Sequence, residues 1–123
     1  MRDLYQPGRS TVHAPNGMAA TSHPLSTSTA LNILRTGGNA MDAAIAAVAV
    51  QCVVEPQSTS IGGDCFCLYS PKGQGVVAYN GSGTAPNSAT PDWYIKNGIN
   101  KIEQQTPHSV TIPGAVDAWS QLL

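Results

Sequence analysis

Cys65 and Cys67 are two residues apart, a spacing that would place both thiols on one face of a strand. Two thiols on one face could bind a metal. A structural zinc site needs four ligands, usually from two such pairs. The three histidines do not supply a second pair at a suitable spacing. We therefore expect no metal and no cofactor, and we expect these thiols and Cys52 to stay free and to pack as small apolar groups. The histidines are His13, His23 and His108.

Two glycine-rich segments could in principle hold an anion or a nucleophile. The segment Ile61-Gly62-Gly63-Asp64 could cradle an anion, but it lacks the Gly-Lys-Ser/Thr of a phosphate-binding loop and precedes a strand. The segment Gly81-Ser82-Gly83 matches only half of the G-x-S-x-G elbow that presents a catalytic serine. The first segment is better explained as a glycine turn that close backbone packing requires, and Ser82 in the second as an ordinary loop serine.

Thr21-Ser22-His23 is a third candidate, because a threonine can act as a nucleophile when its own α-amine serves as the base. That chemistry requires the threonine to be the first residue of a chain, and Thr21 is internal. His23-Pro24 instead marks the start of a helix, where proline is favoured. No complete active site is therefore readable, and we assign no catalytic residue in this chain.

The elements that must position these residues are a helix pair and a hairpin. A helix over 25–36 ends at Gly37-Gly38, and a second helix spans Ala40–Val54 with Asn39 as its N-cap. This second helix is apolar all round, so we expect it to be buried on most sides. Strands at 65–69 and 76–79 form a hairpin. The remaining expectations are an irregular first 17 residues, a short strand at 18–21, a helix from Thr90 to Lys96 and a helix that starts at Pro113-Gly114.

Composition excludes several classes of protein. The chain has 123 residues and a formal net charge of −1, which speaks against nucleic-acid binding. Hydrophobic residues make up 41%, too many for disorder. The longest apolar run, Ala40–Val54, is shorter than the roughly 20 residues of a membrane helix. The first 13 residues show no signal peptide, so we expect a cytoplasmic protein that does not associate with membranes.

Charged residues make up only 11%, so much of the surface is expected to meet other protein. The chain also stops within a helix that has no C-cap. Both features favour a fragment of a longer protein, with 1–123 as one domain and no second domain.

Several stretches, in order, resemble the N-terminal region of the gamma-glutamyltranspeptidases. Together they cover most of the chain, and the ordered set is more specific than any one motif. The resembling residues are His23-Pro24-Leu25, Gly37-Gly38-Asn39-Ala40 with Asp42-Ala43-Ala44, Val54-Glu55-Pro56, Ile61-Gly62-Gly63, Thr84-Ala85-Pro86 and Ile112-Pro113-Gly114.

The resemblance implies an α+β protein with part of the αββα N-terminal nucleophile hydrolase fold, its Ala-rich helix packed on a mostly antiparallel sheet. Members of the family cut themselves into a large and a small subunit, and the new N-terminal threonine attacks a γ-glutamyl amide such as glutathione. This chain resembles only the start of the large subunit. Its partners would be a γ-glutamyl substrate and the small subunit or remainder of the precursor, and the chain alone is expected to be inactive.

The resemblance also points to a substrate-binding position at which this sequence departs from the family. An arginine before Ala-Pro usually pairs with the substrate α-carboxylate, and it would stand at Ser82 or, in some relatives, at Thr84. Neither residue is basic, so a related acylase with a non-glutamyl donor is one alternative. A non-catalytic paralogue or binding module is another.

Overall fold

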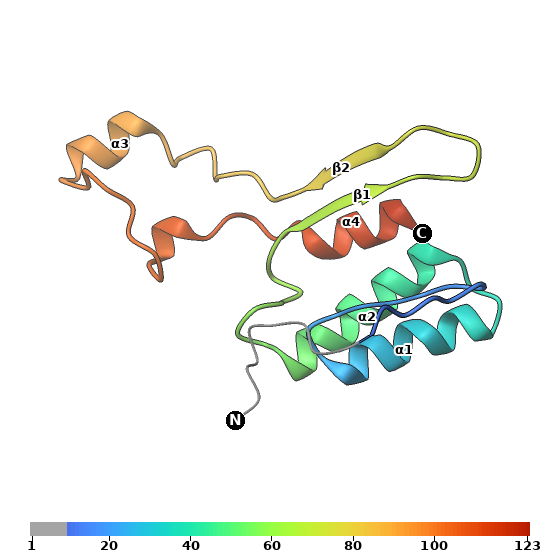
Figure 1. Cartoon of the computed structure of the whole chain (residues 1–123). Coiled ribbons are helices and arrows are strands. Elements are labelled where there is room, and N and C mark those ends of the chain that lie inside the picture. Colours follow the sequence, from blue (N-terminus) through green and yellow to red (C-terminus); the bar gives the residue numbers. More distant parts are fainter. Residues whose placement is uncertain (1–9) are drawn as a thin grey trace, which may run out of the picture.

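The structure, a computed structural model, describes residues 10–123, and the expectations for residues 1–9 lie outside the described residues. Figure 1 shows a pair of helices, a hairpin with one helix beneath it, and an arm that carries a short helix. The elements are α1 (Pro24–Arg35), α2 (Ala40–Val54), β1 (Cys65–Tyr69), β2 (Val77–Gly81), α3 (Pro91–Lys96), the 3-10 turn η1 (Pro107–Ser109) and α4 (Ala115–Leu122).

The turn between α1 and α2 is defined by local sequence, as predicted. Gly37 has a φ of 98°, a conformation that a side chain would strain. The side-chain oxygen of Asn39 accepts hydrogen bonds from the N–H groups of Met41 and Asp42, and the Asp42 carboxylate accepts one from the N–H of Asn39 at 2.8 Å. This reciprocal capping box starts α2 where the sequence predicts it. Among the described residues, no helix is both long and apolar enough to span a bilayer.

The two helices pack through small side chains. Ser26 and Ala30 of α1 and Ala43 and Ala47 of α2 are buried, and each pair is spaced by four residues. Small residues at that spacing lie on one face and let two helix backbones approach closely. Burial of α2 is limited to this stripe within residues 10–123, since Val53 is 78% exposed. The cover that we expected on most sides of α2 is supplied mainly by α1, and Ala19 packs against the same cluster of buried residues.

The strand expected at 18–21 is absent from the described residues. This segment instead runs in an irregular, extended form along the helix pair (Figure 1), where Ala19 packs against its core. A strand needs a neighbour for its hydrogen bonds, and the sheet of the described residues contains only β1 and β2. Residues 10–17 are also free of helix and strand, in agreement with the predicted irregular N-terminal segment.

The hairpin forms as predicted, with β1 antiparallel to β2 and a register that runs from Cys65 opposite Gly81 to Tyr69 opposite Val77. β2 begins one residue later and ends two residues later than we expected. The helix that contacts the hairpin is α4 rather than α2 (Figure 1). A Cβ on Gly81 would overlap the Cβ of Ala118 in α4, so glycine is needed for this close approach.

The arm that carries α3 projects away from the helix pair (Figure 1). Trp93 and Tyr94 meet edge to face with centroids 5.2 Å apart, and the His108 ring lies 5.5 Å from Tyr94. This aromatic cluster joins α3 to η1, a turn that the sequence analysis missed. Edge-to-face contacts of this kind stabilise by about 0.5–1.5 kcal/mol each beyond the area they bury.

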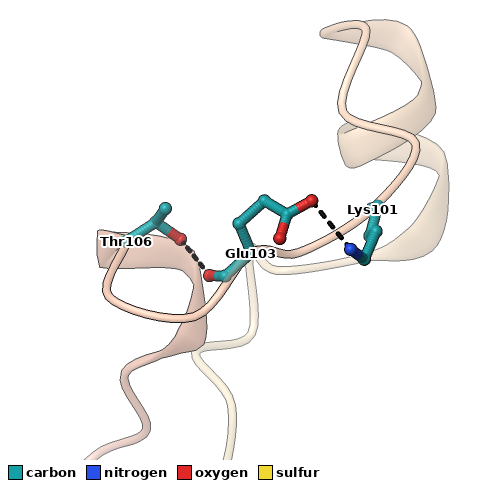
Figure 2. A network of polar contacts seen from close by, with 3 residues as sticks. All are labelled: Lys101, Glu103 and Thr106. Atoms are coloured by element: carbon teal, nitrogen blue, oxygen red, sulfur yellow. Dashed lines mark hydrogen bonds and ion pairs between the residues drawn. The ribbon is translucent and has the colours of Figure 1, made fainter.

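The chain between α3 and η1 is held by local polar contacts. Figure 2 shows Lys101 paired with Glu103 at 2.9 Å, and the hydroxyl of Thr106 donating to the carbonyl of Glu103. Both charged side chains are largely exposed, so the pair contributes at most about 1 kcal/mol. Gln105 in the same turn has a φ of 65°, which is uncommon for a residue other than glycine.

Candidate functional site

Three segments that are far apart in the sequence meet where β1 begins, β2 ends and α4 begins (Figure 1). We call this place the loop junction, and it comprises 62–64, 80–84 and 111–115. The N–H groups of Gly114 and Ala115 both donate to the carbonyl of Gly63, at 3.1 and 3.0 Å. The N–H of Ile112 donates to the carbonyl of Thr84 at 3.0 Å. Three of the glycine- or proline-containing motifs found in the sequence therefore form one site.

Asp64 connects the three segments through a single carboxylate oxygen. Its Oδ1 accepts a hydrogen bond from the N–H of Gly83 at 2.9 Å and another from the hydroxyl of Thr111 at 3.3 Å. These partners lie 19 and 47 residues away in the sequence. The sequence predicts Asp64 only as the end of a glycine turn. No local pattern could have revealed its role, because both partners are distant along the chain.

Two glycines of the loop junction, Gly83 and Gly114, are required by close backbone contacts. A Cβ on Gly83 would overlap the carbonyl oxygen of Ile112. A Cβ on Gly114 would overlap the carbonyl oxygen of Gly81 and would lie 2.9 Å from the nitrogen of Gly83. In Ile61-Gly62-Gly63-Asp64, by contrast, a Cβ on Gly62 or Gly63 would lie at least 3.5 Å from its neighbours, so the prediction that close backbone packing requires these two glycines is wrong.

The two candidate substrate-binding residues, Ser82 and Thr84, flank the anchored Gly83 but face different surroundings. Oδ1 of Asn80 accepts hydrogen bonds from the Ser82 N–H at 3.0 Å and from the Ser82 hydroxyl at 2.8 Å. Ser82 is thus half-buried and turned back on its own loop, whereas Thr84 is exposed. Within residues 10–123, the one lysine or arginine in an ion pair is Lys101, in the arm. The loop junction therefore offers hydroxyl and amide groups, with Asp64 as a charged side chain in its hydrogen-bond network.

The segment Thr21-Ser22-His23 forms the start of α1, as predicted, and does not form a nucleophilic site. Nδ1 of His23 accepts a hydrogen bond from the N–H of Leu25 and so caps the helix. The Thr21 hydroxyl donates to the carbonyl of His23 at 2.8 Å.

A small polar network ties the start of α1 to the end of α2. The Ser22 hydroxyl donates to the Glu55 carboxylate, and the Gln51 amide donates to both Ser22 and Glu55. The sequence does not predict this network, since Ser22 lies 29 and 33 residues from its partners.

Cys65 and Cys67 lie on the same half-buried face of β1, and all three cysteines carry free thiols. Burial and the neighbouring Cys67 thiol raise the pKa of Cys65, although a hydrogen bond from Trp119 of α4 acts in the opposite direction. No group of three or more His, Cys, Asp or Glu side chains gathers in a metal-binding arrangement among residues 10–123.

The sequence profile described as Gamma-glutamyltranspeptidase matches residues 26–123. The chain belongs to the gamma-glutamyltranspeptidase family. The matched range includes α1 from its third residue, all of α2, the hairpin and the whole loop junction.

Three similar proteins illustrate the family. The chain is 39% identical over 108 residues to the glutathione hydrolase-like YwrD proenzyme of Bacillus subtilis, covering 86% of this chain and 20% of that protein. It is 38% identical over 109 residues to the oxamate amidohydrolase proenzyme of Klebsiella pneumoniae, covering 88% and 20%. The crystal structure of Helicobacter pylori gamma-glutamyltranspeptidase superposes with a TM-score of 0.82 at 28% identity, covering 93% of this chain and 34% of that one.

These findings confirm the predicted fold class. The chain is an α+β protein whose helices and two-stranded antiparallel sheet match part of the N-terminal nucleophile hydrolase fold of this family. It spans about a fifth of the length of the curated relatives described above.

Proposed function

We propose that this chain is the N-terminal part of the large-subunit region of an amide-cleaving acyl-transfer enzyme of this family. The enzyme would take an acyl group, γ-glutamyl or a related one, from an amide onto an N-terminal threonine outside these 123 residues. Water or an amine would then accept the acyl group. The observation that carries the proposal is the loop junction, which gathers three of the family's ordered motifs around Asp64 and Gly83.

The proposal treats the loop 80–86 as the part of this chain that meets the acyl donor. In the family an arginine before Ala-Pro is expected to pair with the donor carboxylate, and this chain has Ser82 and Thr84 at the two possible positions. A charge-assisted hydrogen bond of that kind contributes about 1.5–3 kcal/mol. At about 1.4 kcal/mol per tenfold, its loss corresponds to roughly 10- to 150-fold in discrimination.

The lack of a basic residue at positions 82 and 84 also supports a second candidate function. An acylase that uses a non-glutamyl donor would need no cation at Ser82 or Thr84. The similarity to a protein named oxamate amidohydrolase, at 38% identity, supports donors other than γ-glutamyl amides in this part of the family.

The hairpin supports a further part of the proposal, that the remainder of a precursor covers this chain. Phe66 and Leu68 lie on the face of β1 away from α4 and are 71% and 76% exposed. Exposed apolar side chains that gather on one face mark an interaction surface. A second layer contributed by the same precursor, or by the small subunit cut from it, is the partner that we propose for this face. The names of both relatives include the word proenzyme, which fits such a precursor.

The test begins with the complete reading frame that contains this segment. Expression followed by gel electrophoresis should show self-cleavage into two subunits, and the purified protein should turn over a γ-glutamyl or related anilide. A γ-glutamyl anilide and a 4-aminobutanoyl anilide, which lacks the α-carboxylate, then compare donors. The wild type should prefer the carboxylated donor only weakly in kcat/KM.

Introducing an arginine at the loop should restore the preference for the carboxylated donor. Thr84→Arg should do so more than Ser82→Arg, because Thr84 is exposed whereas the Ser82 side chain bonds back to Asn80. Ser70→Arg adds the same charge beyond the opposite end of the hairpin and should leave the kcat/KM preference between the two donors unchanged. Wild-type discrimination above about a thousandfold would show that another residue supplies the cation. A stable, uncleaved protein without turnover of any donor would favour the non-catalytic binding module.

A further inference from the structure

The charged side chain that joins the three segments of the loop junction is Asp64. It stands directly before β1, and its Oδ1 receives the N–H of Gly83 from the loop after β2 and the hydroxyl of Thr111 from the segment before α4. One acceptor atom thus links three parts of the chain. The other hydrogen bonds between the three segments join backbone groups, which do not depend on side-chain identity.

The bond to Gly83 sits at the centre of the loop that we propose to meet the acyl donor. Gly83 lies between Ser82 and Thr84, so the hydrogen bond that fixes its N–H also fixes the positions of both neighbouring side chains. The absence of a Cβ lets this residue lie against the carbonyl of Ile112, and the bond from Ile112 to Thr84 holds the following residue. Two hydrogen bonds therefore hold the backbone of the loop. One runs from the N–H of Gly83 to the Asp64 carboxylate, and the other runs from the N–H of Ile112, in the segment before α4, to the carbonyl of Thr84.

We propose that Asp64 is the positioning residue of the loop 80–86, and that it acts as a hydrogen-bond acceptor rather than as a charge. The inference rests on the proposed function only in that this loop contacts the donor. Both donors to Asp64 are neutral groups, and both reach the same oxygen atom. An asparagine offers an amide oxygen with two acceptor sites in the same place. Asn at position 64 should thus preserve the anchor, and Ala should remove it.

Hydrogen exchange measured by mass spectrometry on the complete polypeptide tests the anchor directly. Asp64→Ala should speed hydrogen exchange about tenfold or more in peptides that cover 80–86 and 111–115. Without the Asp64 carboxylate the loop opens more often, and its amides exchange with solvent while it is open. Asp64→Asn should exchange as the wild type does. Asp92→Ala is the matched control, because Asp92 is also exposed but lies in α3 on the arm.

The kinetic readout separates positioning from general structural damage. Asp64→Ala should raise KM for the acyl donor at least about tenfold with a smaller change in kcat, and Asp64→Asn should restore the wild-type KM for the uncharged donor. Wild-type exchange in Asp64→Ala would overturn the inference, and so would an Asn variant that exchanges as fast as the Ala variant. A polypeptide that turns over no donor would defeat the proposed function, while the exchange measurement would still decide the role of Asp64.

Discussion

Gly83→Ala should be among the most damaging single-methyl changes in this chain. The added Cβ would overlap the carbonyl oxygen of Ile112, which is rigid backbone and cannot move as a flexible side chain would. The loop must then separate from the segment before α4. That movement breaks the hydrogen bond from Gly83 to Asp64, 2.9 Å long, and the bond from Ile112 to Thr84, 3.0 Å long.

The expected cost follows from those two bonds and from the disturbed packing of α4. Each hydrogen bond contributes about 0.5–1.5 kcal/mol net, and the repacking between Gly81 and Ala118 adds about 1 kcal/mol. We expect the free energy of unfolding to fall by about 2–4 kcal/mol. Gly75→Ala is the matched control, since a Cβ there meets nothing within 4 Å and its φ is not positive. It should lie within about 0.5 kcal/mol of the wild type.

Urea denaturation of the complete polypeptide, followed by tryptophan fluorescence, measures both variants under the same conditions. The midpoint should shift for Gly83→Ala with little change in the slope, because the surface exposed on unfolding is nearly unchanged. If Gly83→Ala and Gly75→Ala differ by less than about 0.5 kcal/mol, the close contact with Ile112 does not exist in solution and the account of the loop junction is wrong.

Three more predictions concern single side chains. Asp64 holds the loop without needing its charge, but the proposed function brings a donor carboxylate to that loop, and like charges about 4 Å apart in water repel by about 1 kcal/mol. Asp64→Asn should therefore improve kcat/KM for a carboxylated donor relative to an uncharged one by about fivefold; equal ratios in wild type and variant would contradict this. Burial and Cys67 raise the pKa of Cys65, so less thiolate is present at pH 8 and iodoacetamide should modify Cys65 more slowly in the folded than in the urea-unfolded chain. Mass spectrometry should show that the difference in Cys65 modification rate between the folded and unfolded chain becomes smaller above pH 9. A thiol titration under denaturing conditions without reductant should find three free thiols. Asn39→Ala removes the capping box of α2 and should cost about 1 kcal/mol in urea denaturation, whereas Asn39→Ser should recover most of it.

The sequence alone determined the elements whose ends depend on neighbouring residues. Asn39 and Asp42 are three positions apart, so the capping box that starts α2 is a local interaction that a reader can recognise without the fold. Gly37 follows the end of α1 and Pro56 follows the end of α2, and both act through local backbone preferences that can be recognised in the sequence. The ordered motifs also sufficed for the resemblance to the family, because their order along the chain is a property of the sequence itself.

Packing between elements was less predictable. An alanine-rich helix that is apolar on every side contains no signal for which face meets which neighbour. The stripe of Ala43 and Ala47 against Ser26 and Ala30 therefore appeared only in the structure, as did the placement of α4 rather than α2 on the hairpin.

The loop junction was decided by tertiary structure alone. Asp64 meets Gly83 and Thr111 across 19 and 47 residues, and nothing in the residues next to it distinguishes an anchor from the end of a turn. The same holds for Ser82 and Thr84, which occupy similar positions in the sequence. Ser82 is half-buried and donates its hydroxyl to Asn80, whereas Thr84 is exposed. Local sequence defines caps and turns through bonds between near neighbours. The contacts that give this site its shape join distant segments, and only the folded chain brings them together.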